Sequence, residues 1–142
     1  MKIKGLCIVI TIVLASCNHM KEVPINKFVG LWEIKGRSMF EGIHVRIEQQ
    51  DQKLIGKIES LNHNKLIKMF AEVGDIWVAD ISRSSNFQFK LTERKIANDL
   101  FSLYGQSTSQ DFKVEFIDDN TIGLGFGGAD PQHSKILYKR IK

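Results

Sequence analysis

Short runs in which apolar and polar side chains alternate are the feature that most constrains this chain. The first run, residues 28–37, places Gly30, Trp32 and Ile34 on one side of an extended segment. Such alternation is typical of a strand that buries one face. Similar runs recur roughly every eleven residues, and Asn, Asp, Gly and Ser residues separate them as turn signals. This rhythm predicts an all-β domain.

The runs predict nine short strands, at residues 28–37, 43–48, 54–58, 66–70, 76–81, 87–91, 112–116, 121–126 and 134–141. Between the sixth and seventh strands, Ile96, Leu100 and Leu103 follow helical spacing, and Gly105 suits a left-handed stop. We expect one short helix over 93–104, with a further strand there as the alternative.

The connections between these runs are too short for parallel crossovers, so the sheet should be antiparallel. Strands so evenly spaced suggest a closed barrel or a sandwich, and only a barrel removes both exposed edges. We therefore expect a single antiparallel β-barrel of about nine short strands with one short helix.

The first sixteen residues resemble a secretory signal peptide. Two lysines precede an apolar run that is too short to span a bilayer comfortably. A buried core helix is the alternative, but no amphipathic face or cap supports it. The run ends Leu14-Ala15-Ser16-Cys17, which resembles the bacterial lipobox. That resemblance implies cleavage before Cys17 and acylation of Cys17, and several acyl chains hold a protein firmly on a membrane.

This interpretation divides the chain into a lipoprotein signal peptide (1–16), a lipidated Cys17 with a tether (17–27) and a barrel domain (28–142). We expect a lipid-anchored protein of the bacterial cell envelope. Asn18 follows the cysteine, in place of the aspartate that signals inner-membrane retention, which favours the outer membrane. The side of that membrane that the domain faces stays open.

Composition narrows the range of partners. Removal of residues 1–16 takes away two lysines and no acidic residue, which lowers the net charge from +4 to +2. No run of Lys and Arg forms a candidate nucleic-acid groove, so we expect no nucleic-acid partner. Cys17 is then the only cysteine, so the domain must be held together by packing without an internal disulfide. We expect a monomer.

The opening strand also carries a family resemblance. Gly30-Leu31-Trp32 resembles the G-x-W signature on the first strand of lipocalins, which are small antiparallel β-barrels. That family places a basic residue near the end of its last strand, against the tryptophan, and Arg140 matches this position. The resemblance spans residues 28–141 and implies a lipocalin-like barrel closed structurally by Gly30, Trp32 and Arg140.

Aromatic residues in the alternating runs are the candidates for lining the barrel interior. A small barrel either fills its lumen with side chains or holds one small ligand there. One hypothesis is a membrane-anchored protein that binds a small apolar or amphipathic ligand in the lumen. The alternative is a structural or interaction lipoprotein with a filled barrel. The candidate ligand-binding residues are Trp32, Trp77, Phe87, Phe89 and Tyr138.

Nothing in the sequence forms a catalytic or cofactor motif. Gly123-x-Gly125-x-x-Gly128 matches the dinucleotide fingerprint by letter, but Pro131 follows where a helix should continue. We interpret it as a strand whose glycine face lets a neighbouring element approach closely. The four histidines form no pair at ligand spacing, and no Gly-x-Ser-x-Gly elbow occurs. We expect no enzyme activity, no metal and no cofactor.

Overall fold

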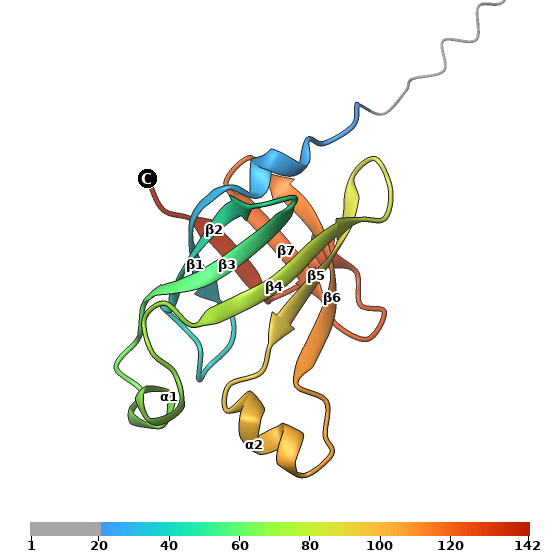
Figure 1. Ribbon diagram of the computed structural model, residues 1–142. Coiled ribbons are helices and arrows are strands. Elements are labelled where there is room, and N and C mark those ends of the chain that lie inside the picture. Colours follow the sequence, from blue (N-terminus) through green and yellow to red (C-terminus); the bar gives the residue numbers. More distant parts are fainter. Residues whose placement is uncertain (1–20) are drawn as a thin grey trace, which may run out of the picture.

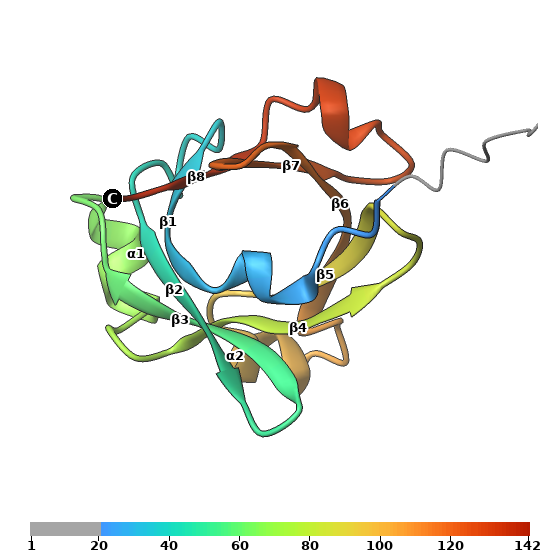
Figure 2. The ribbon, with the colours of Figure 1, turned by 90° about the horizontal axis from the view of Figure 1, so that it is seen from above.

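The computed structural model describes residues 21–142 (Figure 1). The predicted signal peptide and Cys17 lie outside the described residues. Eight strands form a closed antiparallel barrel, which confirms the predicted fold class and is compatible with a lipocalin-like fold. Figure 2 shows the closed ring of strands from above. Within residues 21–142, no helix combines the length and the apolar character that a membrane crossing requires.

Each strand pairs with the next along the chain, and the last strand returns to the first. The strands are β1 (Gly30–Lys35), β2 (His44–Gln50), β3 (Lys53–Ser60), β4 (Ile76–Arg83), β5 (Gln88–Arg94), β6 (Ser109–Asp118), β7 (Thr121–Gly125) and β8 (Leu137–Arg140). The helices are α1 (Lys65–Phe70) and α2 (Asn98–Leu103), with the 3-10 turns η1 (Ile25–Phe28) and η2 (Pro131–His133).

The prediction of a strand over residues 66–70 is wrong, because this segment forms α1. The side chain of Asn64 accepts hydrogen bonds from the backbone N–H groups of Leu66 and Ile67 and so caps the helix. Only Ile67 of the helix is buried. A short apolar run cannot be assigned to strand or helix by periodicity alone. The barrel therefore has eight strands instead of nine.

The helix predicted over 93–104 is present but shorter. β5 continues to Arg94, and α2 covers only Asn98–Leu103. Ala97, at φ 56°, adopts a left-handed conformation that separates strand from helix. Because no residue of α2 is buried, packing does not favour a longer helix.

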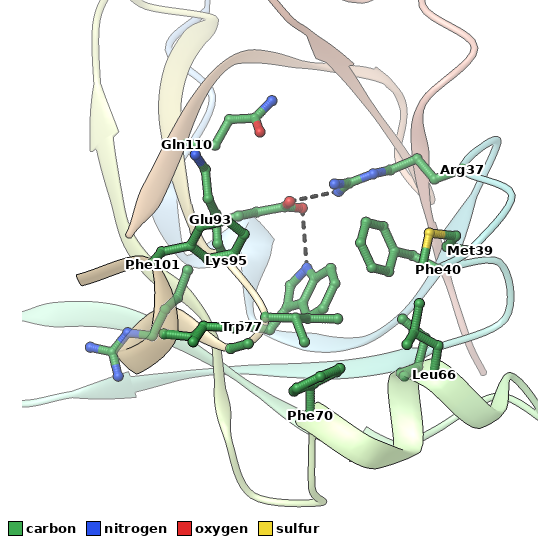
Figure 3. Close-up of a pocket in the computed structure, with 15 residues that line it drawn as sticks. Arg37, Met39, Phe40, Leu66, Phe70, Trp77, Glu93, Lys95, Phe101 and Gln110 are labelled. Atoms are coloured by element: carbon green, nitrogen blue, oxygen red, sulfur yellow. Dashed lines mark hydrogen bonds and ion pairs between the residues drawn. The ribbon is translucent and has the colours of Figure 1, made fainter. Parts of the chain in front are cut away.

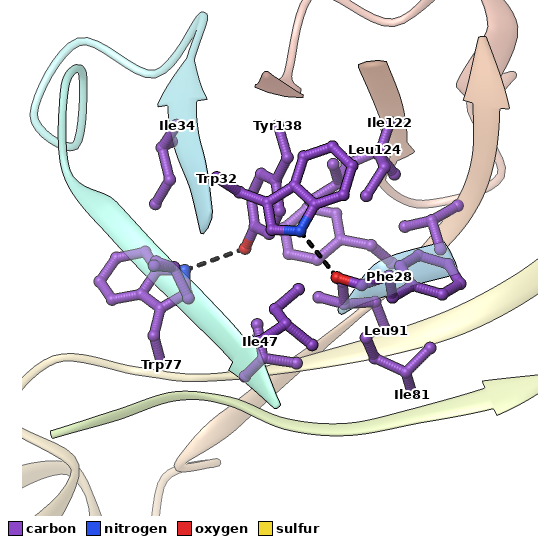
Figure 4. Close-up of a cluster of buried hydrophobic side chains, with 14 of the residues drawn as sticks. Phe28, Trp32, Ile34, Ile47, Trp77, Ile81, Leu91, Ile122, Leu124 and Tyr138 are labelled. Carbon is purple, nitrogen blue, oxygen red and sulfur yellow. Dashed lines mark hydrogen bonds between the residues drawn. The ribbon is translucent and has the colours of Figure 1, made fainter. Parts of the chain in front are cut away.

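One end of the barrel is closed by η1 (Figures 1 and 2). Phe28 of this turn is fully buried and meets the ring of Phe89 edge-on at 4.8 Å between centroids. Trp32 Nε1 donates a hydrogen bond to the Phe28 carbonyl oxygen over 2.7 Å. Figure 4 shows Phe28 and Trp32 among the aliphatic residues of the inner strand faces. The half of the barrel near η1, hereafter the closed end, is thus filled by side chains.

Arg140 joins the last strand to the first at the closed end. In the β1–β8 pairing Trp32 lies opposite Arg140, whose guanidinium carbon is 4.2 Å from the Trp32 ring centroid. Arg140 Nη1 and Nη2 donate to the carbonyl oxygens of Val29 and Lys27, over 3.0 and 2.6 Å. A Cβ on Gly30 would lie only 2.7 Å from Arg140 Nη1, and Gly30 has φ +143°. The three predicted closure residues therefore lie together.

The glycine-rich segment near the C-terminus is strand β7 and the turn after it. Its inward residues, Ile122 and Leu124, are fully buried. On the outer face, a Cβ on Gly123 or Gly125 would collide with backbone carbonyl oxygens of the loop that carries η2. These glycines thus serve close approach of that loop, as the strand interpretation predicts.

Candidate functional site

The barrel end opposite η1 opens into a cavity of about 370 Å³, hereafter the mouth cavity. Its walls come from α1, α2, residues 37–40, Trp77 of β4, the end of β5 with the loop after it, and Gln110 of β6 (Figure 3). The volume lies within the range of about 300–1,000 Å³ that is common for small-molecule sites. Most of the lining is apolar, and its larger members are Phe40, Leu66, Phe70, Trp77, Leu100 and Phe101.

A buried carboxylate forms the polar floor of this cavity. Glu93 is 3% exposed and accepts hydrogen bonds from Arg37 Nη1 over 2.6 Å and from Trp77 Nε1 over 3.1 Å. The Tyr138 hydroxyl also donates to Glu93. The pKa of Tyr138 is raised well above the ordinary tyrosine value, because burial and the charge of Glu93 both disfavour the phenolate. Tyr138 therefore remains a hydrogen-bond donor, and the buried carboxylate has a cation and two neutral donors as partners.

Arg37 reaches this floor from the turn after β1. Gly36 has φ +78°, and a Cβ there would collide with the Lys135 carbonyl oxygen, so the turn depends on glycine. The Arg37 side chain is 17% exposed, and its guanidinium carbon lies 4.5 Å from the Phe40 ring centroid. Among the described residues, Glu93 is the one hydrogen-bond acceptor that Arg37 meets. No buried side-chain N or O atom of the described residues lacks a hydrogen-bond partner, so the Arg37 N–H groups that Glu93 does not use keep some exposure to solvent, and Arg37 is among the residues that line the cavity.

The cavity lining carries more positive than negative charge. Arg94 and Lys95 also line it, and neither forms an ion pair with another residue of the described chain. The Lys95 ammonium lies 5.5 Å from the centroid of the Phe101 ring. The lining thus includes three cationic residues and one carboxylate, so the site favours anionic over cationic groups.

Exposed apolar side chains gather around the mouth. Of the thirteen large hydrophobic residues exposed in the described part of the chain, eight lie in α1, in α2 or in loops near the cavity, and four of these eight line the cavity itself. These are Met39, Leu66, Met69, Phe70, Val73, Leu100, Leu103 and Tyr104. Clustered apolar exposure of this kind marks a binding surface more often than scattered residues do.

The structure separates the five predicted ligand-binding residues into three places. Trp77 lines the mouth cavity, and Tyr138 lies behind it, with its hydroxyl oxygen 3.0 Å from Trp77 Nε1. Trp32 and Phe89 are fully buried in the closed end. Phe87 is 39% exposed, because it lies in the β4–β5 turn, where Ser85 Oγ accepts from its backbone N–H. Strand alternation therefore does not extend from Phe89 to Phe87.

Sequence reasoning missed Glu93, Arg37 and the walls of the cavity. Glu93 continues the inward face of Phe89 and Leu91 by strand alternation, so a signal existed, but assigning residues 93–104 to a helix concealed it. Arg37 follows a turn and has no local signal. Arg37 follows β1, whereas Glu93 lies on β5, four strands further along the barrel. Only the closure of the barrel brings the two side chains together.

No group of three or more His, Cys, Asp or Glu residues within 21–142 is arranged to hold a metal ion. Comparison with known proteins finds no match to this chain among family models, curated proteins or solved structures.

Proposed function

We propose that this protein binds a small apolar or amphipathic ligand in the mouth cavity of its lipocalin-like barrel. The observation that carries the proposal is one apolar cavity of about 370 Å³ that ends on a preformed polar floor at Glu93 and Arg37. Mostly apolar walls with a few fixed polar groups are typical of small-molecule sites. The apolar rim supports the proposal further, because an apolar ligand entering from water crosses it first.

The ligand site in this proposal is the mouth and not the whole lumen. Phe28, Trp32 and Phe89 are fully buried and fill the closed end, so a ligand has no room there. This same filling supports the second candidate, an interaction lipoprotein whose apolar rim contacts another envelope protein. In either case we propose a bacterial envelope lipoprotein anchored through Cys17, on the basis of the leader and the lipobox-like Leu14-Ala15-Ser16-Cys17.

A titration of the purified protein with the uncharged fluorescent probe N-phenyl-1-naphthylamine tests the ligand proposal. We expect saturable binding at about one probe per chain, with a change in Trp77 emission because Trp77 lines the cavity. Phe70→Asp should weaken binding by about tenfold or more, since a carboxylate in the apolar wall opposes desolvation.

The matched control is Phe87→Asp, which changes a phenylalanine of similar exposure, 39% against 45% for Phe70, outside the cavity. It should leave probe affinity unchanged. If the folded protein shows no saturable probe binding, the ligand proposal is wrong and the interaction lipoprotein is favoured instead.

A further inference from the structure

We infer that the ligand of the mouth cavity carries an anionic head group, such as a carboxylate, which the free N–H groups of Arg37 hold at the cavity floor. This inference rests on the proposed function and adds the chemical class of the ligand. It starts from an asymmetry between the two charged groups of the floor. Both oxygens of Glu93 accept hydrogen bonds from the protein, whereas Arg37 uses only one of its N–H groups in the bond to Glu93.

Glu93 is a poor receptor for a cationic head group. It is 3% exposed, and its two oxygens already accept from Arg37, Trp77 and Tyr138. A ligand ammonium would have to displace Arg37 and would leave a guanidinium without its carboxylate partner at a largely buried position. Breaking a buried ion pair in this way is strongly unfavourable.

Arg37 is suited to an anion. A guanidinium has five N–H donors in a rigid fork that matches a carboxylate, and here a single acceptor uses Nη1. The guanidinium carbon lies 4.5 Å from the Phe40 ring centroid and 5.5 Å from the Phe112 ring centroid, so these rings and the hydrogen bond to Glu93 restrict its movement. The donors that border the cavity are therefore oriented before a ligand arrives, which lowers the entropic cost of binding.

The charged residues around the cavity also favour an anionic head group. Arg94 and Lys95 line the cavity and raise its positive potential. The adjoining hollow, where Arg94 and Lys95 also lie, is lined by the acids Asp75 and Asp99, and neither of them lines the mouth cavity itself. The ligand that fits is an amphiphile with an anionic head inside and an apolar tail directed outwards to the exposed rim.

Displacement of bound N-phenyl-1-naphthylamine by three twelve-carbon compounds tests the head group in the purified protein. Dodecanoate should displace the probe at about tenfold lower concentration than dodecanol, because charge-assisted hydrogen bonds are stronger than neutral ones. Dodecylammonium should be the weakest competitor. Equal displacement by all three compounds would overturn the inference and leave the proposed function intact, whereas absence of probe binding would contradict the proposed function itself.

The double variant Arg37→Met/Glu93→Gln assigns the preference to Arg37. It removes the guanidinium without leaving an unpaired carboxylate, and the amide oxygen that Glu93→Gln introduces can still accept from Trp77 and Tyr138. We expect loss of the tenfold preference for dodecanoate with dodecanol displacement retained. Arg46→Met, which removes an arginine paired with Glu59 on the outer wall, should keep the preference. A preference that survives the double variant would overturn the role of Arg37, and the compound series on the parent protein tests the ligand class even if that variant does not fold.

Discussion

Two arginine side chains stack on aromatic rings at opposite ends of the barrel, and their partners give them different roles. Arg140 lies over Trp32 and donates to two backbone carbonyl oxygens, so it completes the closed end. Arg37 lies over Phe40, donates a hydrogen bond only to the Glu93 carboxylate among the described residues, and lines the mouth cavity. The same side chain thus acts as a structural closure at one end and as a candidate ligand contact at the other.

The contact between Trp32 and Arg140 predicts coupled effects on stability. Trp32→Ala should lower the free energy of unfolding by about 3–5 kcal/mol through lost contacts and a cavity. Arg140→Ala should cost about 1–2 kcal/mol, from the ring contact and the two hydrogen bonds. In denaturant unfolding, the double variant should lose less free energy of unfolding than the sum of the losses in the two single variants, because each change removes the same contact. For the control Arg46→Ala, on the outer wall, the loss in free energy of unfolding should be additive with that of Trp32→Ala. Strict additivity between Arg140→Ala and Trp32→Ala would contradict the coupling.

At the scale of elements, α1 shows how a local cap decides between two structures that the pattern allows. Residues 66–70 resemble a strand by composition, yet Asn64 offers its side-chain oxygen to two backbone donors of the first turn. Helix formation places Ile67 against the core and leaves Leu66 and Phe70 at the mouth cavity. A β-strand here would have added a ninth strand and removed one wall of the cavity.

Asn64→Ala should therefore affect both stability and binding. We expect a loss of about 1 kcal/mol in the free energy of unfolding, which is typical of a lost N-cap. Because Leu66 and Phe70 of α1 line the cavity, affinity for N-phenyl-1-naphthylamine should fall as well. Asn64→Asp keeps an acceptor at the cap and should preserve both quantities. If Asp lowers both as much as Ala does, the cap does not hold α1 in place.

At the scale of the whole molecule, the chain enters the barrel at the end away from the cavity (Figure 1). Val23 is held to the β4–β5 turn, because its N–H donates to Asn86 O over 2.8 Å and its carbonyl accepts from Arg83 Nη2. A lipid on Cys17 would therefore place the closed end at the membrane and direct the mouth away from it.

Replacement of the cysteine tests the anchor on which this orientation depends. Cys17→Ser, expressed in a bacterial host, should leave the membrane fraction or accumulate as uncleaved precursor, because the acylated side chain is removed. Cys7→Ser changes the other cysteine, within the leader, and should leave processing and membrane association unchanged. A Cys17→Ser protein that matures and stays with the membrane would contradict the lipoprotein proposal.

The sequence alone determined most strands of this barrel and their antiparallel order. Side chains on a strand alternate with a period of two, so the apolar and polar pattern of each half-buried strand indicates which of its faces is buried. β2, with Val45 and Ile47 inward, and β7, with Ile122 and Leu124 inward, follow this rule closely. The Gly30-Leu31-Trp32 match also indicated correctly that Arg140 lies near Trp32, although 108 positions separate them.

Only the tertiary structure determined which end of the barrel is filled by side chains and which end holds a cavity. Whether inward side chains fill a barrel depends on how elements distant in sequence meet across it, and no local pattern records that. Phe28, from the turn before β1, fills the closed end against Phe89, while two short helices and Arg37 hold the other end open around Glu93. Glu93 falls within the range 93–104 that is expected from the sequence to be a helix, and only its partners Arg37, Trp77 and Tyr138 identify it as the floor of a site.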